Sequence, residues 1–339
     1  MIGRLIMFVV FLALCLPAAA LRSEDRALTH ANSIRKGEIA YKEGYFGEGN
    51  NRLHYVEAGN GPLVILYHGF PSFWFSWFDQ MEELKGQYRV VAVDGLGAGL
   101  SAKPESLDAY RVEKLAGQID RLARHLNGKR RFILIGHDWG AALAFAYAQA
   151  YPKRLNAVIG MSAPPYNLFL ETLRTSKEQQ ARSNYMQFFN TVTINDIRNR
   201  NMGETVWRQS YSALLERGDL SKEEGELFRK ALADPLAING GMNWYRANIP
   251  PVNEIHPTTL WPLANQKINV PALLIWGNED RTFVAEFMDR MSGYSSDMQI
   301  TRLPGINHWT SIEQSERATK AIVLFLNSKS GAKRKAVSK

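Results

Sequence analysis

The chain has 339 residues, of which 45% are hydrophobic and 22% are charged, with 26 glycines and 14 prolines. These fractions match ordinary globular usage and exclude a disordered, collagenous or coiled-coil protein. The formal net charge of +8 includes five positive charges near the C-terminus that no acidic residue opposes: Lys329, Lys333, Arg334, Lys335 and Lys339. We therefore expect residues 328–339 to form a basic, disordered tail. The net charge is weak support for nucleic-acid binding.

The first twenty residues have the pattern of an export signal. Arg4 precedes an uncharged run over residues 5–21 that ends in Pro17-Ala18-Ala19-Ala20. A charged start, an apolar middle and a small-residue cleavage site are typical of a secretory signal peptide, so we expect residues 1–20 to be removed and the protein to be periplasmic or secreted.

Two alternatives for this segment remain open. The uncharged run over residues 5–21 reaches the lower length limit for an uncleaved membrane anchor. A lipid-bearing segment would use Cys15, although the bulky Leu14 stands where a small residue is expected before the cysteine. Because Cys15 is the only cysteine of the chain, an internal disulfide and a cysteine-based zinc site are both excluded.

Short apolar runs alternate with amphipathic stretches from about residue 47 onward. This alternation predicts an α/β protein whose mostly parallel sheet is flanked by helices. The alternation then stops over residues 165–262, which have the pattern of helices rich in aromatic residues and arginine. The predicted strands are 53–56, 63–67, 89–93, 132–135, 157–161, 272–276 and 298–303, and the predicted helices are 73–84, 111–126, 140–151 and 311–325.

The helical segment divides the α/β region into two parts, residues 47–164 and 263–327. An insertion into a parallel sheet should lie above the carboxyl ends of the strands, where ligands bind in such sheets. We therefore expect residues 165–262 to form a helical cap over a binding site. A second, independent domain is the alternative.

The segment Gly136-His137-Asp138-Trp139-Gly140 joins a predicted strand to a predicted helix. It has the form of a nucleophile elbow with Asp138 at the position that is often serine. Attack by a carboxylate on an acyl carbon would give an anhydride, whereas attack on a saturated carbon gives an alkyl ester that water can cleave. The pattern therefore predicts that Asp138 is a nucleophile toward an alkylating electrophile, with helix capping as the alternative role.

An acid and a histidine follow two later predicted strands. Asp280 comes after strand 272–276 and His308 after strand 298–303, so the chain order is nucleophile, acid, histidine. We expect His308 to activate water against the Asp138 ester and Asp280 to orient the imidazole. Glu279 is the rival for the acid.

Two loops that contain glycine lie near the predicted strand ends. His68-Gly69-Phe70-Pro71 is expected to supply the backbone N–H of Phe70 to an oxyanion hole, together with that of Trp139, because Pro71 has no N–H. An ordinary turn is the alternative. The loop over residues 94–99 has the spacing G-x-G-x-G, which differs from the dinucleotide fingerprint, so we expect no cofactor site there. Chemistry by the nucleophile, acid and histidine requires no metal and no organic cofactor, and we expect neither.

As a set, these residues resemble the epoxide hydrolases of the α/β-hydrolase fold. The resemblance covers about residues 47–326 and includes the two loops, the elbow, Asn243-Trp244-Tyr245-Arg246 and Asn307-His308-Trp309. One departure is Leu96, where the family often has arginine, and it puts the contacts of that loop in doubt.

The resemblance implies that two tyrosines of the cap, Tyr185 and Tyr245, donate hydrogen bonds to the epoxide oxygen. Tyr166 is the fallback for Tyr185. A phenol with a pKa near 10 is a neutral donor at pH 7 and can protonate the alkoxide that ring opening produces. The implied reaction converts an epoxide to a vicinal diol through a hydroxyalkyl ester on Asp138.

The implied partner is a small, apolar epoxide, and no nucleic acid is expected. A membrane contact is expected only if the N-terminal segment is an uncleaved anchor, and the sequence does not indicate an oligomeric state. Five aromatic residues are expected to contribute to the substrate pocket: Trp139, Phe73, Trp74, Phe189 and Trp244. At helical spacing, however, most aromatic residues belong to a core.

Two other functions compete with epoxide hydrolysis. Haloalkane dehalogenases resemble this chain in the nucleophile, the histidine, the acid and Trp139, but they often have asparagine where this chain has Phe70. A non-catalytic relative that serves as a binding module is the third alternative. Such relatives usually lack a catalytic residue, and every required position is filled here.

Overall fold

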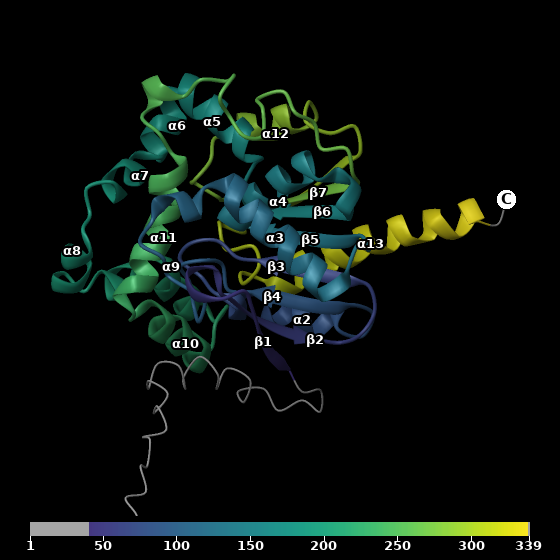
Figure 1. Ribbon diagram of the computed structural model, residues 1–339, viewed down its shortest axis with the longest axis horizontal. Helices are drawn as coiled ribbons and strands as arrows, with labels where there is room; N and C mark the ends of the chain where they lie inside the picture. The colour runs from purple at the N-terminus through teal and green to yellow at the C-terminus, as the bar shows by residue number, and fades with distance from the viewer. Residues whose placement is uncertain (1–40, 338–339) are drawn as a thin grey trace, which may run out of the picture.

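The computed structural model describes residues 41–337, and it describes side chains as far as residue 329. The predicted signal peptide at residues 1–20 and its alternatives lie outside the described residues. No helix within residues 41–337 combines the length and the apolar character that crossing a membrane requires. The described chain forms one eight-stranded sheet with helices on both faces (Figure 1).

The sheet is parallel over most of its width. The strand order is β1-β2-β4-β3-β5-β6-β7-β8; β2 pairs antiparallel with both β1 and β4, and all other neighbours are parallel. The predicted α/β architecture is therefore confirmed. The strands are β1 (Lys42–Phe46), β2 (Leu53–Ala58), β3 (Leu63–Tyr67), β4 (Arg89–Val93), β5 (Phe132–His137), β6 (Leu155–Met161), β7 (Ala272–Gly277) and β8 (Met298–Leu303).

The central strands are buried on both faces. In β3, Leu63, Ile65 and Tyr67 belong to one hydrophobic cluster, whereas Val64 and Leu66 belong to the cluster on the opposite face. This alternation follows the two-residue period of a strand. Because both faces are covered, the strands read in the sequence as continuous apolar runs.

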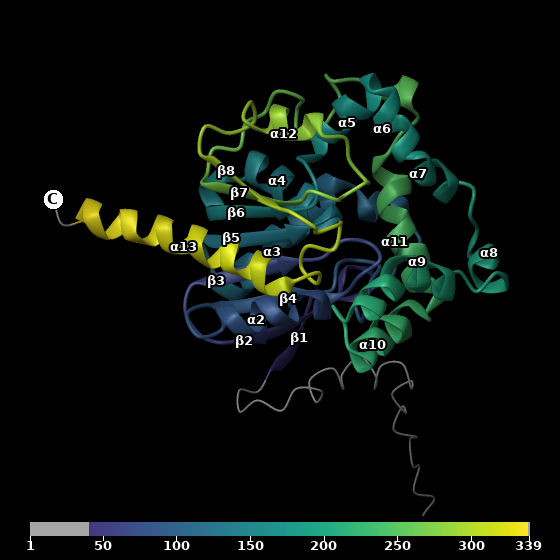
Figure 2. The ribbon, with the colours of Figure 1, turned by 180° about the vertical axis from the view of Figure 1, so that it is seen from behind.

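Two layers of helices cover the sheet. α3 (Val112–Asn127) and α4 (Trp139–Ala150) lie on one face, and α2 (Phe78–Leu84) and α13 (Ser315–Val337) lie on the other (Figures 1 and 2). Buried residues of α12 (Glu286–Met291) pack in the same cluster as those of α3 and α4. The sheet is thus the middle of three layers.

Between β6 and β7 the chain leaves the sheet and forms helices. Residues 162–271 contain no strand. In both ribbon views, most of these helices lie to one side of the sheet, beyond the ends of its strands (Figures 1 and 2). The helices of this insertion are α5 (Tyr166–Thr175), α6 (Lys177–Arg182), α7 (Asn184–Phe189), α8 (Ile194–Asn199), α9 (Met202–Arg217), α10 (Lys222–Leu232) and α11 (Pro235–Asn248).

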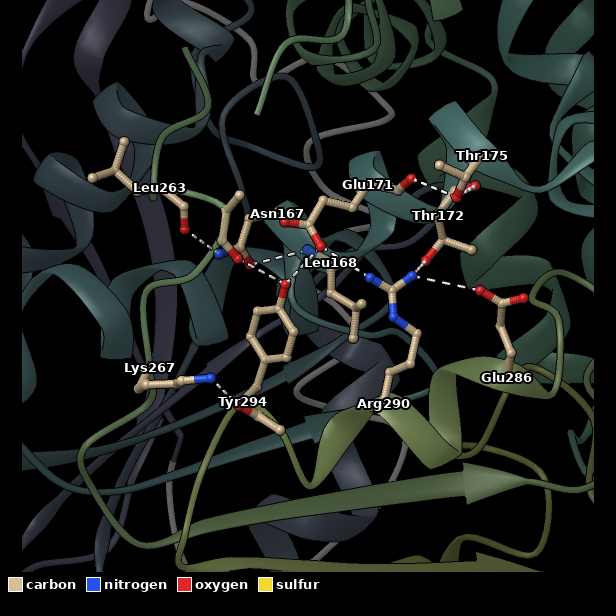
Figure 3. Close-up of polar contacts among 12 residues, drawn as sticks. Asn167, Leu168, Glu171, Thr172, Thr175, Leu263, Lys267, Glu286, Arg290 and Tyr294 are labelled. Atoms are coloured by element: carbon tan, nitrogen blue, oxygen red, sulfur yellow. Dashed lines mark hydrogen bonds and ion pairs between the residues drawn. The ribbon is translucent and has the colours of Figure 1, made fainter. Parts of the chain in front are cut away.

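A polar network attaches the first helix of the insertion to the sheet layer (Figure 3). Arg290 of α12 donates to Thr172 Oγ1 at 2.6 Å and to Glu171 Oε2 at 2.9 Å, both on α5. Tyr294 donates to the same Glu171 oxygen at 3.1 Å. These bonds join residues more than 110 positions apart in the chain, so they fix α5 against α12.

A buried ion pair fixes two loops that border the carboxyl ends of the strands. His54 Nδ1 lies 2.7 Å from Asp94 Oδ2, and both side chains are at most 1% exposed. The same carboxylate accepts hydrogen bonds from the backbone N–H groups of Trp74 and Leu100. Burial alone would raise the pKa of Asp94, but the charge and hydrogen bond of His54 hold that pKa below its ordinary value. Asp94 is therefore an ionised anchor for both loops.

The structure corrects the sequence prediction in four elements. β1 and α12 were not predicted, and the predicted helix 73–84 begins as a 3-10 turn at Trp74–Trp77 before α2. α13 continues to Val337, so the expectation of disorder from residue 328 is wrong as far as residue 337. Alanine, lysine and arginine favour helix, and extending a helix that is already formed costs little compared with starting one.

Candidate active site

Asp138 lies at the sharp turn between β5 and α4. Its φ of 53° and ψ of −123° place a non-glycine residue in a strained backbone region. A Cβ at Gly136 would lie 2.0 Å from the Gly140 carbonyl oxygen, and one at Gly140 would lie 1.9 Å from the Tyr67 carbonyl oxygen. Glycine is therefore required on both sides of the turn, and the turn directs the carboxylate outward from the strand end.

Three groups contact or stabilise the Asp138 carboxylate. Its Oδ1 accepts a hydrogen bond of 2.9 Å from the backbone N–H of Phe70, and His308 Nε2 lies 3.4 Å from its Oδ2. Burial by itself raises the pKa of Asp138, but His308 and the backbone N–H of Trp139 lower it below the ordinary value. The carboxylate is therefore ionised at neutral pH. Both backbone donors predicted for the oxyanion hole act on this residue.

His308 lies between two carboxylates. Its Nδ1 is 2.8 Å from Asp280 Oδ2, and the other Asp280 oxygen accepts from the Thr282 backbone N–H at 2.8 Å. Glu279, the rival acid, is exposed. Burial lowers the pKa of His308, but the Asp280 and Asp138 carboxylates together raise it to about 10. The structure thus brings together the nucleophile, acid and histidine expected from the chain order.

This charge arrangement predicts how stability depends on pH. The pKa of His308 is raised from 6.5, so its contribution to stability is complete below pH 6.5 and is lost as the pH rises through about 10. The pKa of Asp280 is lowered from 3.8, so its contribution is present above pH 3.8 and is lost as the pH falls through the folded-state value. Both contributions are therefore present between about pH 4 and 6.5.

We expect Asp280→Asn to lower the thermal unfolding midpoint most within this window and progressively less toward pH 10. Melting curves of both proteins from pH 4 to pH 10 measure the difference. Asp297→Asn, which removes an exposed carboxylate paired with Lys329, is the control and should give a small, nearly constant difference. A difference for Asp280→Asn that does not vary with pH would contradict the ionic pairing described here.

Two tyrosines from the insertion line the same cavity as Asp138. Tyr185 comes from α7 and Tyr245 from α11, and their ring centroids are 5.9 Å apart. Burial and the Asp138 charge raise the pKa of Tyr185, and burial, Tyr185 and Asp138 raise the pKa of Tyr245. Both phenols are therefore protonated at neutral pH. The wall of this cavity consists of Asp138, Trp139, Ala142, Ala163, Pro164, Tyr166, Phe169, Tyr185, Met186, Tyr245 and Phe283.

Tyr166, the fallback for Tyr185, also lines this cavity but its hydroxyl is already engaged. It donates to the Asn248 carbonyl oxygen at 2.6 Å. Asp138 is the one residue of the cavity wall with an ionisable acidic or basic side chain, so the wall is otherwise apolar or phenolic. Within residues 41–337, no group of three or more His, Cys, Asp or Glu residues could hold a metal ion.

The aromatic residues predicted to bind substrate fall into three groups. Trp139 lines the cavity, and the ring of Phe189 lies 4.9 Å from that of Tyr245. Trp244 instead lines a second cavity and donates its indole N–H to the Leu96 carbonyl oxygen at 2.7 Å. Since this bond uses the backbone oxygen of Leu96, it does not depend on the Leu96 side chain.

Phe73 and Trp74 require a correction. Each is 1% exposed and packs in the core on the α2 and α13 face of the sheet, away from both cavities. The Phe73 ring contacts Phe75 and Phe228. Their aromatic character was a poor guide because a buried core selects the same residue types as an apolar pocket.

Several wall residues were not predicted from the sequence. Ala163 and Pro164 lie two and three residues after the end of β6, and Phe283 comes three residues after Asp280, so proximity to strand ends was an available signal. Phe169 and Met186 gave no comparable signal. They reach the cavity because of the way α5 and α7 pack over the sheet, which the sequence pattern does not specify.

Comparison with known proteins identifies relatives with the same overall design. The alpha/beta hydrolase fold family matches residues 62–315. Epoxide hydrolase 4 of Mus musculus is 32% identical over 285 residues, which cover 81% of this chain and 76% of that protein. A crystal structure of Bacillus megaterium epoxide hydrolase with an inhibitor has a TM-score of 0.77 at 28% identity and matches 84% of this chain and 100% of that one.

A mutant of the Bacillus megaterium enzyme has been crystallised with its product, (R)-3-[1]naphthyloxy-propane-1,2-diol. That structure has a TM-score of 0.74 at 28% identity and matches 84% of this chain and 100% of that one. The family match and the identity to the mouse protein both extend over most of the chain. This chain therefore belongs to the epoxide hydrolases of the alpha/beta hydrolase fold, which are hydrolases acting on ether bonds.

Proposed function

We propose that the protein hydrolyses apolar epoxides to vicinal diols through a covalent ester on Asp138. One observation carries the proposal: an ionised carboxylate and two neutral phenols line one largely apolar cavity. A nucleophile with proton donors beside it suits the opening of a strained ether, because the C–O bond breaks without needing a good leaving group once the oxygen is protonated.

In the first step, Asp138 Oδ2 attacks one epoxide carbon and the ring C–O bond breaks. Oδ2 is assigned this role because Oδ1 is held by the Phe70 N–H and would become the carbonyl oxygen of the ester. Tyr185 and Tyr245 donate hydrogen bonds to the epoxide oxygen, and one of them gives it a proton. The product is a hydroxyalkyl ester of Asp138.

In the second step, His308 takes a proton from water, which attacks the ester carbonyl carbon. The bond between that carbon and Oδ2 then breaks, and Oδ2 takes the proton from His308 and leaves as the second hydroxyl of the diol. The proton of the new Asp138 carboxyl group returns to the tyrosine that lost its proton in the first step. The Asp138 charge is one of the causes that raise the pKa of His308, so esterification removes that cause and lowers the pKa. The imidazole then becomes available as a base. The Asp280 carboxylate holds its Nδ1, and the N–H groups of Phe70 and Trp139 stabilise the oxyanion.

The substrate is a small epoxide that bears an apolar, flat group. The aromatic rings of Trp139, Phe169 and Phe283 in the cavity wall support this choice. The product crystallised with the Bacillus megaterium enzyme carries a naphthyloxy group, which is flat and apolar. We propose that the helical segment 165–262 acts as a cap that supplies the tyrosines and keeps bulk water from the ester.

We also propose that the protein is exported through its first twenty residues. The support is the sequence pattern alone, with Arg4 before an uncharged run that ends in alanines. The mass of the protein recovered from expressing cells, measured intact, distinguishes a chain that begins at Leu21 from an uncleaved anchor.

The activity is tested with purified protein and a panel of aryl and long-chain epoxides alongside bromoalkanes. We expect diol without halide release, and we expect Asp138→Ala to reduce diol formation by at least about 10⁴-fold because the nucleophile is removed. Halide without diol would replace the proposal with a haloalkane dehalogenase. No product from the whole panel would favour a binding module.

A further inference from the structure

The short helix that carries Tyr185 depends on contacts from outside it. α7 has six residues, Asn184–Phe189, and helices of this length are not stable on their own. Its N-cap, Ser183, makes no side-chain capping bond. The position of the Tyr185 hydroxyl is therefore determined by what holds this helix in place.

Arg246 of α11 provides a large part of that support. Its Nε donates to the Phe189 carbonyl oxygen at 2.8 Å, and its Nη2 donates to the Val192 carbonyl oxygen at 2.7 Å. The first of these carbonyls belongs to the last residue of α7, where backbone oxygens have no partner within the helix. Arg246 thus closes the end of α7 and fixes the chain that follows it.

The rest of the guanidinium is tied to its own helix. Nη1 contacts Asn239 Oδ1 at 2.9 Å and Asn243 Oδ1 at 2.7 Å, and Nη2 contacts Met242 Sδ at 3.8 Å. With the two carbonyl bonds, five contacts match the five N–H groups of the guanidinium. The planar group is therefore held rigidly between α11 and α7, which lie beside each other in Figures 1 and 2.

These contacts are geometric and do not neutralise a charge. Arg246 has no carboxylate partner among the described residues, and its acceptors are two carbonyls, two amides and a thioether. Burial lowers the pKa of Arg246 below its ordinary value, which is the cost of keeping an unpaired cation partly buried. The five contacts of the guanidinium therefore give Arg246 a structural task at this place.

The contacts of Phe189, whose carbonyl oxygen accepts a hydrogen bond from Arg246, indicate what this task is. The ring of Phe189 lies 5.5 Å from the ring of Tyr185 and 4.9 Å from the ring of Tyr245, in edge-to-face contact with both. Tyr245 directly precedes Arg246 on α11. The guanidinium, the Phe189 backbone and the Phe189 ring therefore form one connected unit that spaces the two phenols.

We propose that Arg246 is a positioning residue that sets the separation of the two proton donors. This inference rests on the proposed function, in which both phenols serve the epoxide oxygen during ester formation. Without Arg246, α7 loses its attachment to α11 and the Tyr185 hydroxyl moves away from the substrate oxygen. Ester hydrolysis uses Asp280 and His308, which do not contact Arg246, so only the first step should suffer.

The experiment measures the two steps separately by rapid quench and intact mass. Ester formation is followed in His308→Gln protein with and without Arg246→Gln. Ester hydrolysis is followed in proteins that retain His308, by loading the ester and timing its loss. We expect Arg246→Gln to slow ester formation roughly 10- to 100-fold, as displacing a catalytic group by about an ångström does, and to change hydrolysis less than about twofold.

A second variant and a control separate positioning from general damage. Arg246→Lys keeps the charge with fewer donors and should restore part of the rate of ester formation. Arg208→Gln on α9 removes an exposed arginine from the same insertion and should leave both steps unchanged. Equal rates of ester formation with and without Arg246, or equal slowing of both steps, would overturn the inference. Absence of ester even in His308→Gln would instead overturn the proposed function.

Discussion

The His308→Gln variant should accumulate an ester of Asp138 and lose roughly 10²- to 10⁴-fold in turnover. Glutamine occupies a similar volume but cannot accept a proton from water, so the first step proceeds and the second does not. Intact mass spectrometry after mixing with an aryl epoxide should show the mass of one substrate molecule added to the protein. Peptide mapping should place the addition on Asp138.

The matched control for this result is the double variant Asp138→Ala/His308→Gln. It has the same cavity and the same missing base but no nucleophile, so its mass should not change. An adduct in the double variant would show that another side chain is alkylated. Absence of an adduct in His308→Gln itself, while the unaltered protein forms diol, would contradict the covalent route.

Replacing Tyr185 and Tyr245 together by phenylalanine should slow ester formation by about 10²- to 10⁴-fold. The change removes both hydroxyls while keeping the ring packing, including the edge-to-face contacts with Phe189. The alkoxide then leaves without a proton. Either single replacement should cost less, because one donor remains. The rate of ester loss should stay within about twofold of the unaltered protein, since the phenols act on the other step.

Tyr166→Phe provides the control for the tyrosine variants. Tyr166 lines the same cavity, but its hydroxyl donates to the Asn248 carbonyl oxygen. We expect less than a tenfold effect on ester formation. If Tyr166→Phe proved as damaging as the double variant, the assignment of the proton donors to Tyr185 and Tyr245 would have to be abandoned.

The sequence was most informative where one local pattern determines the structure. The continuous apolar run from Leu63 to Tyr67 predicts a strand covered on both faces, and β3 is such a strand. The elbow around Asp138 needs glycine on both sides for steric reasons that act within a few residues. Asp138, Asp280 and His308 each follow a strand of the parallel part of the sheet, so they lie close together, because the carboxyl ends of parallel strands meet at one edge.

The sequence was least informative where distant packing decides the outcome. β1 has the sequence KEGYF and a largely exposed surface, so its strand conformation depends on pairing with β2. Phe73 and Phe169 are both aromatic and well buried, yet one belongs to the core and the other to the cavity wall. No local pattern distinguishes them. The support of Tyr185 by Arg246 also joins residues that are 61 positions apart along the chain.

The division of the cavity between two parts of the chain has an evolutionary consequence. The carboxylate, imidazole and backbone donors come from the sheet layer, whereas both phenols come from the inserted helices. In the proposed mechanism, mutations in the insertion can therefore alter which leaving atom receives a proton without disturbing the residues that form and hydrolyse the ester. If the proposed roles hold, a protein with this architecture can accept a new class of electrophile through changes in the inserted helices alone, with Asp138 kept as the nucleophile.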